Sequence, residues 1–208
     1  MNPQQYKLRV FVNCPFDRKY LPLFHALVFA IHDCGFIARC ALEELDAGET
    51  RLHKIYRIIE ECKYGVHDLS RIQLSSGGLP RFNMPFEAGI FFACQRFGQG
   101  RQRGKKALVL DSEPYRYMAV LSDIAGQHSE SHGNDPARVI ACVRNWLKTC
   151  SGKDGIPGAK QIARRYEAYR KDLPRILRGA RVTSKELASW EYFSDYRDFV
   201  VAWLKAHG

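Results

Sequence analysis

The chain has 208 residues, enough for one buried core with an appended element, and its 46% hydrophobic and 26% charged residues are typical of a globular protein. No apolar run approaches the roughly 20 residues that a membrane-spanning helix needs, so we expect no membrane partner. The formal net charge of +10 favours an anionic partner, either nucleic acid or a phosphorylated small molecule, and most of the excess lies after residue 95.

The first two-thirds of the chain alternate between strand and helix patterns. Short β-branched or apolar runs predict buried strands at about 7–13, 36–41, 64–68 and 106–110. Between the strands, apolar residues recur at spacings of three and four, which predicts helices at about 18–34, 55–62 and 86–97. Strands and helices that alternate with short connections are typical of a parallel, doubly wound sheet. We therefore predict an α/β, flavodoxin-like fold.

The remaining residues carry helical patterns without further strands. A polar loop is predicted over 127–135, and amphipathic helices follow at about 136–150, 162–173 and 193–204. Few of these helices could bury their aromatic faces alone. We expect an α/β unit over residues 1–126 and a helical extension, residues 127–208, packed on the same domain.

The cysteines and the first residues indicate a cytoplasmic protein. Seven cysteines form no CxxC pair, and most have apolar neighbours, which predicts buried, reduced thiols. Residues 1–5 are polar and lead into a strand, so we expect no signal peptide.

Polar residues gather where the predicted strands end. Ligands of an open parallel sheet bind in the crevice beyond the carboxyl ends of its strands. The residues expected at that edge, in chain order, are Asn13, Asp46, Asp68, Ser70, Arg71, Asn83 and Glu87.

Glu87 is the candidate catalytic residue. Pro85 suits the first turn of a helix, which would place Glu87 in that same turn, where the helix dipole keeps a carboxylate ionised. An ionised carboxylate that faces a sugar stabilises an oxocarbenium-like transition state or traps it covalently. The alternative is a glutamate that only complements the helix dipole, a very common arrangement.

Four segments together resemble the TIR-like and nucleoside deoxyribosyltransferase-like proteins. They are residues 10–13 (VFVN), 46–48 (DAG), 67–70 (HDLS) and 83–89 (NMPFEAG), and the resemblance covers about residues 7–126. The last segment is similar to the Asn-Val-x-Phe-Glu-Leu-Gly segment of bacterial TIR-like nucleotide-binding proteins. Asn83-Met84-Pro85 departs from the deoxyribosyltransferase pattern, which points away from base transfer, although hydrolysis and transfer both stay open.

The resemblance implies the following roles. Glu87 matches the glutamate that breaks an N-glycosidic bond, and Asp68 matches an acidic residue that contacts the sugar. Phe11 and Asn13 fall where both groups line the base pocket. Asp46 and Ser70 would complete the pocket with Asn83, and Arg71 or Arg81 would meet a phosphate. The expected activity is that of an N-glycosidase on NAD or a related nucleotide or nucleoside, without a cofactor, in bacterial antiviral defence.

Other classes of function stay open. A nucleotide-sensing module would use the same crevice without turnover. A basic protein associated with nucleic acid would use the loop at 96–106 and the helix at 164–178, although solvated charge is the usual role of such runs. A homo-oligomer and an activating partner protein are both compatible with the sequence. No metal site is predicted, because the His67-Asp68 pair lacks further ligands at suitable spacing.

Overall fold

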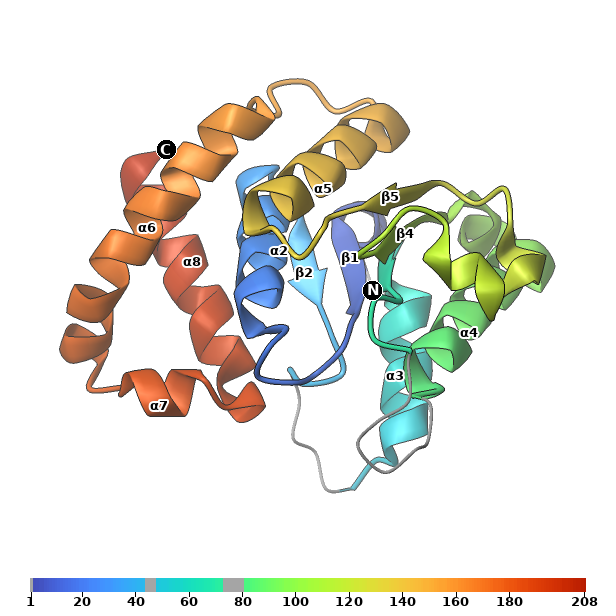
Figure 1. Ribbon diagram of the computed structural model, residues 1–208, viewed down its shortest axis with the longest axis horizontal. Coiled ribbons are helices and arrows are strands. Elements are labelled where there is room, and N and C mark those ends of the chain that lie inside the picture. Colours follow the sequence, from blue (N-terminus) through green and yellow to red (C-terminus); the bar gives the residue numbers. More distant parts are fainter. Residues whose placement is uncertain (1, 44–47, 73–80) are drawn as a thin grey trace.

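The computed structural model describes residues 2–43, 48–72 and 81–208, and its centre is a five-stranded sheet. The strands are β1 (Arg9–Asn13), β2 (Ile37–Arg39), β3 (Tyr64–Asp68), β4 (Lys106–Asp111) and β5 (Ser129–Ser131). All neighbours are parallel, and the order across the sheet is β2-β1-β3-β4-β5 (Figure 1). This confirms the predicted α/β, flavodoxin-like fold with its four parallel strands.

The fifth strand was not predicted from the sequence. β5 pairs with the end of β4, with Ser129 beside Val109 and Ser131 beside Asp111. The prediction of a polar loop over 127–135 is therefore wrong at these three residues. β5 lies at the edge of the sheet and its side chains are partly or fully exposed, so it lacks the apolar pattern of a buried strand. The sheet continues past residue 126, where we expected the α/β unit to end.

Helices cover both faces of the sheet (Figure 1). On one face lie α2 (Leu21–Asp33) and α5 (Pro136–Ser151), and on the other lie α3 (Arg51–Glu61) and α4 (Asn83–Phe97). A hydrophobic core lies on each face of the sheet. The side chains of β1 contribute to the two cores in turn, because successive side chains of a strand point to opposite faces. Val10 and Val12 pack with α2, whereas Phe11 packs with α3 and α4.

The C-terminal helices form an additional layer outside α2. They are α6 (Ala159–Ala180), α7 (Ser184–Leu187) and α8 (Phe193–His207). α6 packs against α2 and α5, and α8 packs against α2 and α6, so these C-terminal helices rest mainly on other helices, whereas α5 lies on the sheet itself (Figure 1). Tyr169 and Trp203 contact Phe29 of α2 and belong to the same hydrophobic core as β1.

Short helical turns complete the fold. They are α1 (Pro3–Tyr6) and the 3-10 turns η1 (Gly100–Gly104), η2 (Arg116–Ala119), η3 (Ser122–Ile124) and η4 (Trp190–Tyr192). All seven cysteines are free. Among the described helices, none is both long and apolar enough to cross a membrane.

Candidate functional site

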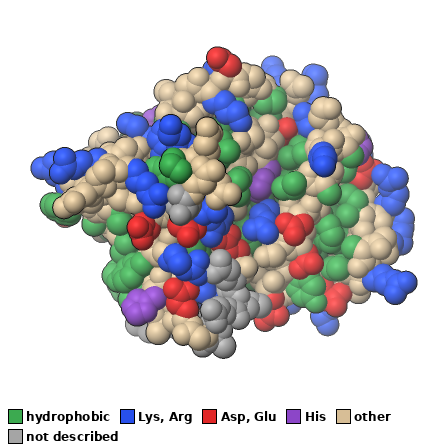
Figure 2. Space-filling view, turned by 180° about the vertical axis from the view of Figure 1, so that it is seen from behind, with side chains coloured by type: hydrophobic (Ala, Val, Ile, Leu, Met, Phe, Trp, Pro, Cys, Tyr) green, Lys and Arg blue, Asp and Glu red, His purple; other side chains and the backbone are tan. Residues whose placement is uncertain are grey.

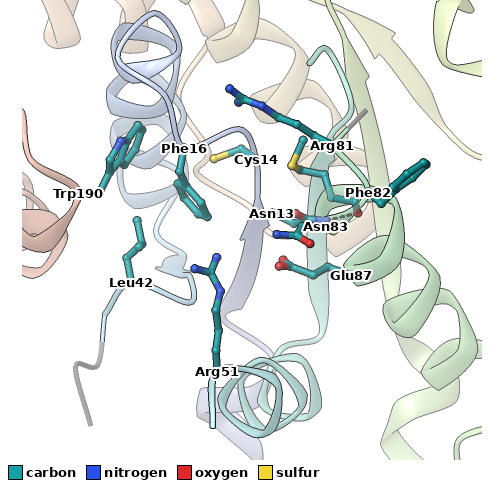
Figure 3. Close-up of a pocket in the computed structure, with 11 residues that line it drawn as sticks. Asn13, Cys14, Phe16, Leu42, Arg51, Arg81, Phe82, Asn83, Glu87 and Trp190 are labelled. Carbon is teal, nitrogen blue, oxygen red and sulfur yellow. Dashed lines mark hydrogen bonds between the residues drawn. The ribbon is translucent and has the colours of Figure 1, made fainter. Parts of the chain in front are cut away.

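A cleft of about 570 Å³ opens at the carboxyl end of β1 (Figure 3). The start of α4 forms one side of the cleft, and the loop after β1 together with η4 forms the opposite side. The start of α3 closes the cleft at one end. Four of the predicted site residues line it. The full lining is Asn13, Cys14, Phe16, Leu42, Arg51, Arg81, Phe82, Asn83, Met84, Glu87 and Trp190.

Glu87 points from α4 into this cleft (Figure 3). The helix begins at Asn83, three residues earlier than predicted, and Pro85 lies in its first turn as expected. Glu87 is consequently the fifth helical residue and lies in the second turn. The influence of the helix dipole falls off beyond the first turn, so the predicted stabilisation of a first-turn carboxylate is wrong.

Burial, and not the helix dipole, governs the ionisation of Glu87. The residue is only 5% exposed, and desolvation raises the pKa of its carboxyl from 4.5 to about 7. The positive charge of Arg51 opposes this rise but does not cancel it. At neutral pH the protonated and ionised forms therefore coexist, whereas the sequence had suggested a fully ionised group. A carboxyl with this pKa can act as a proton donor, a base or a nucleophile near pH 7.

Asn13 presents a hydrogen-bond acceptor to the cleft. Its side-chain nitrogen donates to the backbone carbonyl of Met84 at 2.8 Å and lies 3.2 Å from Nδ1 of His67. A side-chain amide has two N–H donors and one carbonyl oxygen. Both donors are used within the protein, and the Met84 carbonyl fixes the amide because two facing oxygens would repel each other. Oδ1 is therefore the atom that Asn13 can offer to a ligand.

His67 holds the Asn13 amide in this orientation. The ring is fully buried, and desolvation together with the nearby charge of Lys105 lowers the pKa of His67 from 6.5 to about 3. His67 therefore stays neutral at physiological pH, and its Nδ1 accepts from Asn13. Gly65 makes room for the ring, because a Cβ atom there would lie 2.7 Å from His67 Nε2.

Asp68 does not line the cleft, which corrects the expectation that it contacts the sugar there. Asn13 pairs with His67 across the sheet, whereas Asp68 pairs with Leu110, whose side chain packs on the α2 face. The Asp68 carboxylate is fully buried on that face. It accepts from the Tyr20 hydroxyl at 2.6 Å, and its Oδ2 lies 3.0 Å from His132 Nε2.

The other predicted residues divide as follows. Phe11 is fully buried in the core under α3 and α4, so it supports the site from below and does not line it. Ser70 is buried, and its carbonyl accepts from Arg116. Arg71 lies 3.8 Å from Asp17 outside the cleft lining. Asp46 lies outside the described residues.

Two arginines give the cleft a positive character. Arg81 lines it and is bound to Asp17 at 3.0 Å. Arg51, the first residue of α3, reaches into the cleft from the side opposite Arg81 (Figure 3). Sequence reasoning missed Arg51, although its place at the start of the helix after the second strand could have indicated it, since that position lies at the ligand-binding edge.

Aromatic residues from distant parts of the chain form the side of the cleft opposite α4. Phe16 follows β1, and Trp190 belongs to η4 of the extension (Figure 3). Their rings meet edge to face with centroids 5.2 Å apart, and Trp190 also contacts Phe24 at 5.1 Å. No sequence signal connects Trp190 with the first strand, because 174 positions separate it from Phe16.

Within the described ranges, no three His, Cys, Asp or Glu side chains come together in a way that could hold a metal ion. Comparison of the chain with known protein families, with curated proteins and with solved structures finds no match. The resemblance to TIR-like and deoxyribosyltransferase-like proteins therefore stays a prediction, and the geometry of the cleft carries the functional argument.

Proposed function

We propose that the cleft binds a nucleotide or nucleoside, such as NAD, and that Glu87 takes part in breaking its N-glycosidic bond. The observation that carries this proposal is a buried carboxyl at the carboxyl edge of a parallel sheet, with a pKa raised to about 7. Perturbed carboxyls in clefts are more often functional than perturbed carboxyls elsewhere. A bound substrate would displace water from the cleft and strengthen every charge interaction within it.

The chemistry requires one carboxylate close to the anomeric carbon. As the C1′–N bond breaks, its electron pair leaves with the base and positive charge develops on the ribose. The ionised form of Glu87 would stabilise this charge, or its oxygen would bond to C1′ as a transient ester. Water then adds to C1′, and the ester bond breaks where one has formed. The water gives up one proton, which goes to solvent when the base departs neutral and to the base when it departs as an anion. A nicotinamide leaving group carries positive charge beforehand and departs neutral, so it needs no proton donor.

The remaining side chains suit the parts of such a substrate. Asn13 Oδ1 offers an acceptor to a ribose hydroxyl, a role for which buried Asp68 is unsuitable. Arg51 and Arg81 would attract the phosphates. Phe16 and Trp190 offer aromatic surface on which a base can stack or pack edge to face. The cleft volume of about 570 Å³ falls in the usual range for small-molecule sites.

The test is incubation of the purified protein with a panel of nucleosides, mononucleotides and dinucleotides, with products identified by mass spectrometry. We expect release of a free base from at least one of them. The Glu87→Gln variant keeps size and hydrogen bonding but loses the charge, so its turnover should fall by about 10²–10³ with little change in substrate affinity. Glu113→Gln, in an exposed glutamate outside the cleft, is the matched control.

Three outcomes would count against the proposal in different ways. Binding without product, in both the parent protein and the Glu87→Gln variant, would make the cleft a nucleotide sensor. Base release that survives in Glu87→Gln would place the chemistry on another residue. Absence of both binding and turnover across the panel would remove the nucleotide assignment altogether.

A further inference from the structure

The outer face of α6 carries a row of basic side chains that the cleft does not use. Its members are Lys160, Arg164, Lys171, Arg175 and Arg178, and we call them the basic row. Spacings of four, seven, four and three residues keep them on one side of an α-helix. All five are exposed. The opposite side of α6 is buried through Ile162, Tyr166, Tyr169 and Leu177.

Most of the basic row is free of counter-charges. Among the residues that the structure describes, no carboxylate forms an ion pair with Lys160, Arg164, Lys171 or Arg178. Arg175 lies 3.6 Å from Asp172 and remains exposed. Asp172 also accepts a hydrogen bond from Trp203, and Glu167, the other acidic residue of α6, is bound to Arg170 at 3.1 Å.

The neighbouring Arg165 does not belong to the basic row, because its side chain is only partly exposed. It turns toward α2 and lies 3.5 Å from Asp33. Figure 2, which views the molecule from behind, shows Lys and Arg side chains along the margin where α6 lies. The exposed charge of the basic row therefore lies along the edge of the molecule that α6 forms.

The shape of the row favours an extended anion. From Lys160 to Arg178 it spans about 27 Å at 1.5 Å per residue, longer than a small phosphorylated ligand. A membrane-surface helix needs an exposed apolar face to insert between lipids, and here the apolar face of α6 is buried. A compact protein interface needs a desolvated apolar centre, which a row of lysine and arginine does not provide.

We propose that the basic row binds the phosphate backbone of a nucleic acid without reading its sequence. Arginine and lysine neutralise successive phosphates and release condensed counterions, which drives binding without base contacts. This inference does not depend on the cleft or on Glu87. Its surface faces away from α4, with α2 and the sheet in between (Figure 1).

The test uses the full chain and a fluorescein-labelled 20-base-pair DNA duplex of arbitrary sequence, with binding followed by anisotropy between 50 and 250 mM salt. Four or five phosphate contacts predict a slope of about −4 for log K against log salt concentration. The triple variant Arg164→Gln, Lys171→Gln and Arg178→Gln should flatten this slope by about 3 and weaken binding at least about tenfold at 0.1 M salt. An unchanged melting temperature would show that the variant is folded.

A matched triple variant, Lys7→Gln, Arg96→Gln and Lys106→Gln, removes the same charge from exposed positions off α6 and should leave the slope close to that of the parent protein. If this variant flattens the slope as much as the first, general charge and not the basic row drives binding, and the proposal fails. Absence of salt-dependent binding to duplex or single-stranded DNA and RNA would also overturn it. Binding to phosphatidylserine vesicles alone would assign the row to a membrane surface instead.

Discussion

The buried carboxyl of Glu87 should make the stability of the protein depend on pH. Burial raises its pKa from 4.5 to about 7, and at 5% exposure solvent screens the group little. Well below pH 4.5 the carboxyl is protonated in both the folded and the unfolded state, so it does not change the free energy of unfolding. As pH rises through 4.5 the unfolded chain releases this proton while the folded protein keeps it, so the free energy of unfolding falls until the folded group ionises near pH 7. The whole loss amounts to about 3 kcal/mol.

The Glu87→Gln variant removes this titration and should reverse the loss. We expect it to match the parent protein near pH 4 and to exceed its free energy of unfolding by about 3 kcal/mol at pH 8. Urea unfolding followed by far-UV circular dichroism at one-unit steps from pH 4 to 8 measures the difference. Glu113→Gln serves as the control for loss of an exposed charge. A Glu87→Gln variant less stable at pH 8, or a difference that stays constant across the range, would refute a buried carboxyl that resists ionisation.

Three further predictions concern the cleft and the extension. If ionised Glu87 stabilises the ribosyl cation, base release should rise with pH through about 7 and level off above it, whereas a falling profile would make Glu87 a proton donor. Asn13→Asp removes the two N–H donors facing Met84 and His67 and should lower the free energy of unfolding by about 1–3 kcal/mol, measured by urea unfolding at pH 7. Unchanged stability would mean that the amide is not held by these contacts. A chain ending at Ser151 should be insoluble, because the aromatic core shared with α6 and α8 would be exposed, and a soluble, folded fragment would show that the extension is independent.

The sequence predicted the sheet well because buried parallel strands leave a strong local signal. The strand predicted at 64–68 corresponds to β3 without error, and the residues after β1 and before α4 meet at one edge as expected. β5 left no such signal, since an exposed edge strand needs no apolar side chains. The sequence also did not show toward which face of the sheet the Asp68 side chain points. All five residues of β3 are buried, so alternation of polar and apolar residues could not show which of His67 and Asp68 faces α4.

The sequence by itself determined the fold class, the edge of the sheet where a ligand would bind, and Glu87 as the residue to examine there. These follow from local periodicity and from the topology of parallel sheets. Only the tertiary structure decided that Glu87 is desolvated rather than held ionised by a helix end, that Asp68 turns away from the cleft, and that Trp190 lines it. The reason is physical. Burial and pKa depend on atoms brought together by long-range packing, and the spacing of residues along the chain does not specify those neighbours.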